Sequence, residues 1–372
     1  MQRFLITKIW LVLIFSATSC PAQTQSAVHL ELLGQETIPY NYSFKDTPVG
    51  GLSGLTYDPN TQTYYVISDD RSELAAARFY SFKLHLDEHQ KLNEGGIQFE
   101  DVVYLNNSET NEYGKGRIDP EGIAVNRDSL IYISSEGIPS LNIAPFVNVY
   151  SKMGAYEHSF TIPKAYWAAK AESRSEHGVR VNFGFEGLGI SPDKSKLYAA
   201  TENALMQDGP VADSSSGSPA RIIVYDLPSG DILHEYCYQV DAVNVLPGER
   251  GALAVNGLTD VVALDEDGNL LTIDRNYVAK QGTSISLYQV STKGATDIKG
   301  MPAMPQNDQS VRPVDKTLVA NLSDYDITLD NFEGLVLGPE LPGGGRLLLM
   351  VSDNNFSQIQ QTLFTAFRLH AE

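Results

Sequence analysis

The chain has 372 residues, of which 42% are hydrophobic and 9% are aromatic, so it can bury one sizeable core or two small ones. These proportions exclude a disordered chain, a collagen-like repeat and a small disulfide-rich scaffold. Because 27 Lys and Arg stand against 46 Asp and Glu, the formal net charge is -19, and such a chain repels the phosphates of nucleic acids. We therefore expect no nucleic-acid partner.

The N-terminus has the features of a secretion signal. Arg3 and Lys8 precede the apolar run 9–15, which is too short to span a bilayer but has the length of a signal core. Small residues then lead to Cys20, a pattern that resembles the cleavage box of bacterial lipoproteins, in which the cysteine becomes the acylated first residue. The alternative is a plain signal cleaved near Ala22.

Both interpretations predict an exported protein, which is periplasmic, extracellular or an outer-membrane lipoprotein. We divide the chain into a signal at 1–20, a linker at 21–27 and one domain at 28–372. The membrane would be contacted only through a lipid on Cys20. Cys237 is the only other cysteine and lies in an aromatic-apolar run, so we expect a buried, inert thiol and no internal disulfide.

One sequence unit recurs five times along the domain. It consists of a small or acidic residue, a glycine, an alternating apolar stretch, a turn, and an aromatic-apolar strand that ends in an acid. The glycine position falls at 54, 122, 187, 261 by alignment, and 334, which gives steps of 68, 65, 74 and 73 residues. A third strand-like run follows each copy. Short strands with this period predict an all-β chain built by radial repetition, a β-propeller.

The ends of the domain predict how the ring closes. The strand-like run 362–369 has no fourth strand after it, whereas the run 28–34 stands alone before the first copy. Pairing of these N- and C-terminal strands would close the propeller. Five repeats are visible, and a sixth degenerate blade in 86–118 or 291–317 is the alternative. A two-sheet sandwich is a further alternative, but it does not explain the fivefold repeat.

The repeat is expected to gather acids at one face of the disc. A hairpin brings the start of its first strand and the end of its second strand to the same sheet edge. The resulting carboxylate pairs are Glu121 with Glu136, Glu186 with Glu202, Asp260 with Asp274, and Glu333 with Asp353, while Asp69 and Asp70 face Ser53 in the first copy. If the first strand of each blade is innermost, these acids converge on the mouth of the central channel.

So many neighbouring carboxylates raise one another's pKa or require a cation. Oxygen ligands in irregular number suit Ca²⁺ better than Zn²⁺, which prefers His and Cys. Arg71 and Arg275 follow acids of the repeat and could meet an anion held by the metal, such as a phosphate. The alternative is structural: acids at strand ends accept backbone N–H groups and lock neighbouring blades, and the glycines are required because the inner strands crowd the axis.

Several copies of the repeat resemble a known exported family. The stretches GLSGLTYD, DPEGIAV, NFGFEGLGISPD and NFEGLVLG are similar to the "esterase-like activity of phytase" family, the phytase-like domain proteins, over about residues 28 to 370. The resemblance implies a propeller and a calcium-dependent phosphoester hydrolase. By position it implies metal ligands at Glu121, Glu186 and Glu333, with Asp260 in the fourth copy. Ser53 in place of an acid and Val261 in place of a glycine depart from the pattern.

The combined expectation is an exported, monomeric propeller that hydrolyses a small anionic substrate such as a phosphoester, with Ca²⁺ at the acidic channel mouth. Two alternatives stay open. One is a non-catalytic surface propeller that binds a carbohydrate or a protein, and the other is a lactonase-like metal-dependent hydrolase.

Overall fold

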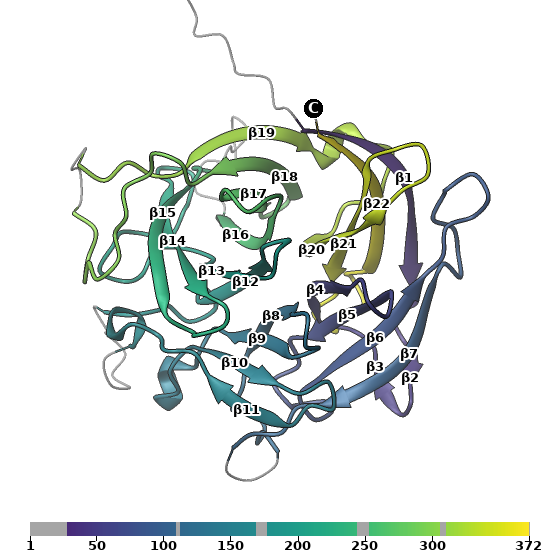
Figure 1. Cartoon of the computed structure of the whole chain (residues 1–372), viewed down its shortest axis with the longest axis horizontal. Coiled ribbons are helices and arrows are strands. Elements are labelled where there is room, and N and C mark those ends of the chain that lie inside the picture. Colours follow the sequence, from purple (N-terminus) through teal and green to yellow (C-terminus); the bar gives the residue numbers. More distant parts are fainter. Residues whose placement is uncertain (1–27, 109–111, 169–176, 244–252, 306–309, 372) are drawn as a thin grey trace, which may run out of the picture.

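The computed structural model consists of five four-stranded antiparallel sheets arranged around a central axis (Figure 1). The structure describes residues 28–108, 112–168, 177–243, 253–305 and 310–371. The predicted signal, the linker and Cys20 lie outside the described residues. The predicted all-β propeller is confirmed, with five blades.

Each blade is a meander whose strands follow one another from the axis outward. Blade 1 consists of β4 (Leu52–Asp58), β5 (Thr63–Ser68), β6 (Arg78–Leu84) and β7 (Ile97–Tyr104). Blade 2 consists of β8 (Pro120–Val125), β9 (Ile131–Ser135), β10 (Phe146–Tyr150) and β11 (Tyr156–Ser159). Blade 3 consists of β12 (Phe185–Ile190), β13 (Lys196–Thr201), β14 (Ser218–Asp226) and β15 (Ile232–Val240).

The last two blades complete the ring. Blade 4 consists of β16 (Ala254–Ala263), β17 (Asn269–Val278), β18 (Gly282–Ser291) and β19 (Asp315–Asn321). Blade 5 consists of β20 (Asn331–Glu340), β21 (Arg346–Asp353), β22 (Thr362–Ala371) and β1 (Val28–Ile38). Strands β2 (Ser43–Phe44) and β3 (Thr47–Pro48) form a small separate hairpin. The described helices are the 3₁₀ turns Pro139–Leu141, Lys164–Tyr166 and Leu322–Asp324.

The ring closes as predicted, because β1 pairs with β22 from Val28 opposite Ala371 to Ile38 opposite Thr362. A sixth blade is absent from the described residues. The two stretches that were its candidates instead contain the outer strand β7 of blade 1 and the start of the outer strand β19 of blade 4.

The core lies between neighbouring blades. Tyr64 and Phe82 of blade 1, for example, pack with Leu349 and Phe364 of blade 5, and the rings of Phe82 and Phe364 are 5.2 Å apart. The two innermost strands of a blade, such as β8 and β9, are therefore buried on both faces, which explains their near-continuous hydrophobic sequence. Cys237 is buried and forms no disulfide, as predicted, and burial raises the pKa of its thiol to about 12, which disfavours the reactive thiolate. None of the helices in the described ranges has the length and apolar character needed to cross a bilayer.

The inner strands β4, β8, β12, β16 and β20 surround the axis and contact one another in a ring (Figure 1). They are so close that the repeat glycines have no room for a side chain. A Cβ on Gly54 would lie 2.6 Å from the carbonyl oxygen of Glu121 in the next blade, and a Cβ on Gly334 would overlap the carbonyl oxygen of Ser53. Crowding at the axis is thus a sufficient reason for these glycines.

Substitution of Gly334 by Ala is expected to lower the free energy of unfolding by about 1–3 kcal/mol, because backbone must move to admit the methyl group. The matched control is Gly114→Ala, since Gly114 is exposed and, among the described residues, its new Cβ would meet only Arg117 at 3.4 Å. We expect less than about 0.5 kcal/mol there. Equal midpoints for the two variants in urea unfolding would contradict the close approach of blades 1 and 5.

Candidate metal and anion site

All inner strands begin at the same end of the channel, and the acids of the repeat lie at that end. Glu121 is the second residue of β8, and Glu186 is the second residue of β12. Glu136 directly follows β9 and Glu202 directly follows β13, the antiparallel partners of those inner strands. The hairpin geometry therefore brings the two acids of each repeat together, as the sequence predicted.

Two groups of three carboxylates in this region have the spacing of a metal site. One group is Asp119, Glu121 and Glu136, and the other is Glu136, Glu186 and Glu202. In each group, one oxygen per residue lies within 4.8 Å of the corresponding oxygens of the other two. Glu136 belongs to both groups and thereby joins blades 2 and 3. Its Oε1 accepts the backbone N–H of Gly184 at 2.7 Å, so its orientation is fixed.

Three further carboxylates complete what we call the acidic cluster. The side chains of this cluster are buried or half-buried, and their charges act on one another. Its members are Asp69, Asp119, Glu121, Glu136, Glu186, Glu202, Glu333 and Asp353. Burial raises the pKa of Glu121, Glu136 and Glu186 well above its ordinary range, and the neighbouring carboxylates raise it further. Burial and the charge of Glu333 raise the pKa of Asp69 to about 7. The cluster therefore requires either protons or a cation.

Arg275 supplies part of the compensating charge. Its Nη2 lies 2.7 Å from Glu202 Oε1, and its Nη1 bonds to both Glu333 Oε1 and Asn331 Oδ1, the latter at 2.6 Å. Its side chain is only 19% exposed. The structure therefore places Arg275 as an internal bridge between blades 3 and 5, with its guanidinium committed to protein carboxylates.

Arg71 is the more accessible of the two arginines. Its Nε lies 2.5 Å from Asp119 Oδ1, its Nη2 donates to Asn182 Oδ1 at 3.0 Å, and its side chain is 38% exposed. Within the described parts of the chain, Nη1 has no hydrogen-bond partner. Arg71 thus presents a free N–H edge beside the acidic cluster, as an anion-binding residue would.

Asp70 lies outside the acidic cluster, contrary to the sequence prediction. Its Oδ2 pairs with Nη1 of the fully buried Arg78 at 2.7 Å, and its carboxylate accepts the backbone N–H groups of Glu73, Leu74 and Ala75. Although burial alone would raise the pKa of Asp70, these hydrogen bonds, first that of Arg78, lower it. Asp70 holds the loop after β5.

We expect Asp70→Asn to lower the free energy of unfolding by about 3–5 kcal/mol, because it leaves Arg78 buried without an anion. Any rise in melting temperature caused by Ca²⁺ should be the same as in the unmodified protein. Thermal unfolding with and without Ca²⁺ measures both quantities. A variant that is as stable as its parent but loses its response to Ca²⁺ would place Asp70 back among the metal ligands.

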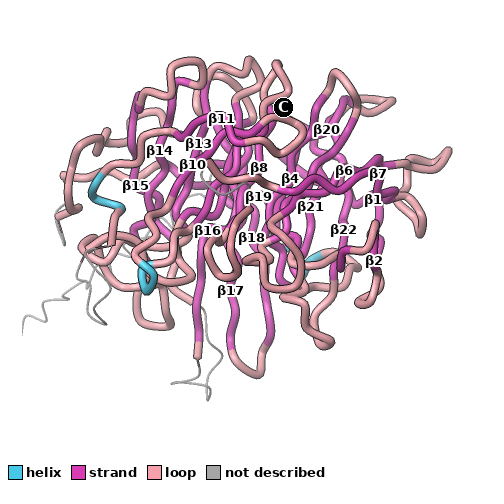
Figure 2. Tube along the Cα trace, turned by 90° about the horizontal axis from the view of Figure 1, so that it is seen from below, coloured by secondary structure: helices cyan, strands magenta, loops and turns pink. Residues whose placement is uncertain are grey.

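Asp274 also differs from the prediction. In the pairing of β16 with β17, Asp274 lies opposite Leu258, whereas Asp260 lies opposite Ile273. Its carboxylate accepts the Tyr238 hydroxyl at 2.6 Å and pairs with Lys316 Nζ at 2.6 Å. Strand alternation then directs the next residue, Arg275, toward the cluster. Strands β16 and β17 extend beyond the other blades at this face of the disc (Figure 2). Arg275 therefore lies inside β17 and not in the loop after it.

Asp260 has the structural role that was the alternative to metal binding: it accepts backbone N–H groups and links neighbouring blades. Its Oδ1 accepts N–H groups of Val261 at 2.8 Å and Leu188 at 3.2 Å, and its Oδ2 accepts that of Leu335 at 2.8 Å. One carboxylate thus connects the inner strands of blades 3, 4 and 5. Burial raises the pKa of Asp260 to about 8. Asp260 belongs to neither of the two carboxylate groups with metal-site spacing.

Sequence reasoning missed Asp119, Asn182 and Asn331. A signal for Asp119 was present in Asp119-Pro120-Glu121, since residues two apart on a strand lie on the same face. The asparagines carried no such signal, because their role depends on contacts with arginines distant in the sequence.

The fold and this site define the chain as a five-bladed propeller with a carboxylate-rich channel mouth. Residues 47–356 match the family model described as "Phytase-like: Esterase-like activity of phytase". The chain belongs to that family. No curated protein is similar enough in sequence to count as a match.

Solved propellers resemble the chain in fold only. A periplasmic gluconolactonase of Pseudomonas aeruginosa is 12% identical, with 93% of this chain and 100% of that chain covered and a TM-score of 0.39. A luciferin-regenerating enzyme is also 12% identical, with 89% and 94% covered and a TM-score of 0.39. Similarity at this level carries no argument about activity.

Proposed function

We propose that the protein is a Ca²⁺-dependent phosphoester hydrolase whose site is the acidic cluster with Arg71. The supporting observation is the sharing of Glu136 by two carboxylate groups of metal-site spacing, with a half-exposed arginine beside them. Family membership agrees with an esterase-type activity.

The residues fit a hard divalent cation. Both groups consist of carboxylates alone, and oxygen ligands are those that Ca²⁺ prefers, whereas Zn²⁺ sites draw on His and Cys. Asp119, Glu121, Glu136, Glu186 and Glu202 would hold the ion. The Gly184 N–H, which Glu136 Oε1 accepts, holds this carboxylate in place between the two groups.

A bound Ca²⁺ supplies Lewis-acid stabilisation of negative charge on a phosphoryl oxygen. The chain itself binds and orients the substrate. Arg71 would donate from its free Nη1 edge to a phosphate oxygen, while Asp119 and Asn182 hold the guanidinium in place. Arg275 acts at a distance from the substrate by neutralising Glu202 and Glu333.

Hydrolysis of p-nitrophenyl phosphate tests the proposal. We expect turnover that is lost in a chelator and restored by Ca²⁺, and a decrease of about 100-fold or more in Glu136→Gln. Glu157→Gln, on the exposed strand β11, is the matched control and should keep full activity. Turnover that persists in chelator would exclude the metal role. Lactone hydrolysis without phosphoester hydrolysis would favour the lactonase alternative, and inactivity on both would favour a binding propeller.

A further inference from the structure

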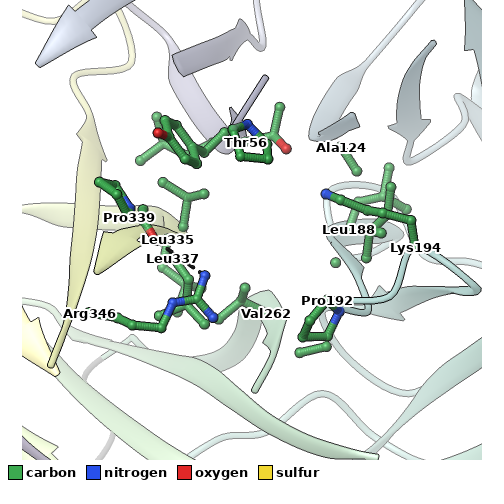
Figure 3. Close-up of a pocket in the computed structure, with 18 of the residues that line it drawn as sticks. Thr56, Ala124, Leu188, Pro192, Lys194, Val262, Leu335, Leu337, Pro339 and Arg346 are labelled. Atoms are coloured by element: carbon green, nitrogen blue, oxygen red, sulfur yellow. Dashed lines mark hydrogen bonds between the residues drawn. The ribbon is translucent and has the colours of Figure 1, made fainter. Parts of the chain in front are cut away.

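The opposite mouth of the channel contains a pocket of about 470 Å³ (Figure 3). Its lining comes from the inner strands, beginning just after the repeat glycines, so it lies at the other end of the channel from the acidic cluster. The wall presents polar and apolar surface in about equal parts, and its apolar part includes Ala124, Leu188, Val262, Leu335 and Leu337. The volume is within the range of small-molecule sites.

Two cations project into this pocket from opposite sides, Lys194 and Arg346 (Figure 3). Lys194 Nζ donates to the carbonyl of Val125 at 3.1 Å, and Arg346 Nη2 donates to the carbonyl of Gly338 at 3.2 Å. In the described ranges of the chain, neither cation forms an ion pair with a carboxylate. The pocket also contains Glu340, which is exposed and faces Arg346 across the β20–β21 pair without forming an ion pair.

These two cations are held in an unfavourable environment. Burial lowers the pKa of Lys194 to about 8 and lowers the pKa of Arg346 below its ordinary value. Other cations of this acidic chain, such as Lys45, Lys152 and Arg275, do pair with carboxylates. An anion between Lys194 and Arg346 would supply the missing charge, and the apolar wall would cover the remainder of its bearer.

We infer that this pocket binds an amphipathic carboxylate, a molecule with one anionic end between Lys194 and Arg346 and an apolar body against Leu188, Val262 and Leu335. A body of about ten carbon atoms matches a pocket of this size. At the inner end of the pocket, Asp260 accepts the backbone N–H groups of the lining residues Leu188 and Leu335. These bonded inner strands separate the ligand from the acidic cluster. The inference is therefore independent of the proposed hydrolytic function.

Calorimetric titration of the full domain with decanoate tests this site. We expect saturable binding of one decanoate per chain. Decanol, which has the body without the charge, and butyrate, which has the charge without the body, should each bind about tenfold more weakly or worse. Equal binding of decanoate and decanol would overturn the role of the two cations.

Variants locate the site. Lys194→Met and Arg346→Met should each weaken decanoate binding about tenfold, whereas Lys45→Met, whose lysine is exposed in the β2–β3 hairpin and pairs with Asp101, should not change it. Val262→Trp fills the pocket from its apolar side and should abolish binding while both cations remain. Circular dichroism of each variant confirms folding. Unchanged binding in folded Lys194→Met and Val262→Trp would overturn the proposal.

Discussion

Replacement of Arg275 by Met is expected to lower the free energy of unfolding by about 3–5 kcal/mol at pH 8. The substitution leaves Glu202 and Glu333 buried at the channel mouth without their shared cation. Burial raises the pKa of both carboxyls, so at pH 5 they take up protons more readily than exposed acids do. A protonated carboxyl has no charge to neutralise, so the arginine then contributes less to stability. The loss should therefore be clearly smaller at pH 5.

Urea unfolding at the two pH values measures this difference. Arg312→Met is the matched control, because Arg312 pairs with Asp315 on the surface with both side chains 60% exposed. We expect a change below about 0.5 kcal/mol there at either pH. Equal destabilisation of Arg275→Met at pH 5 and pH 8 would mean that Arg275 acts through packing instead of charge. Added Ca²⁺ should recover part of the loss at pH 8.

Substitution of Glu186 by Gln is expected to stabilise the metal-free protein at pH 8 by about 1–3 kcal/mol and to abolish stabilisation by Ca²⁺. Glu186 is buried, and its pKa is raised first by burial and then by the charges of Glu121 and Glu136. The folded state thus binds more protons than the unfolded state between the ordinary and the raised pKa. Stability that depends on such a group is present at low pH and is lost as pH rises.

The unmodified protein in chelator should accordingly lose stability from about pH 4 upward. The loss of stability should continue through the pH range in which Asp69, with a pKa of about 7, and Asp260, with a pKa of about 8, lose their protons. Ca²⁺ should reverse this trend, with a larger rise in melting temperature at pH 8 than at pH 5. Glu157→Gln should behave as the parent does. A Glu186→Gln variant that is less stable than its parent in chelator would show that the carboxylate is a structural lock.

Most of the fold was predictable because local sequence patterns specify it. The period near 70, the turn residues and the alternating strands indicated a propeller, and the unpaired runs 28–34 and 362–369 indicated how it closes. The sequence left five or six blades open, because an outer strand such as β7 is mostly exposed or half-buried and lacks the continuous buried run of an inner strand. Its register with β6 is set by tertiary packing.

The site was predictable where it follows from the hairpin rule and unpredictable where it depends on register. Strand pairing within a blade brings Glu121 to Glu136 and Glu186 to Glu202, and the contact between the neighbouring blades 2 and 3 brings the two pairs together. Asp274 does not join them, because its carboxylate binds Tyr238 and Lys316, and the next residue of β17, Arg275, contacts the cluster in its place. Asp70 was misplaced because its partner Arg78 is known only once the loop after β5 is folded.

Titration of Ca²⁺ into chelator-stripped protein at pH 7, in two buffers of different ionisation enthalpy, tests most directly whether the carboxylates of blades 2 and 3 form one cation site. Saturable binding should release protons, because the buried acids that receive the ion hold protons in its absence. Glu136→Gln should show neither binding nor proton release. An absence of binding in the parent protein, or undiminished binding in Glu136→Gln, would contradict a metal site at this mouth.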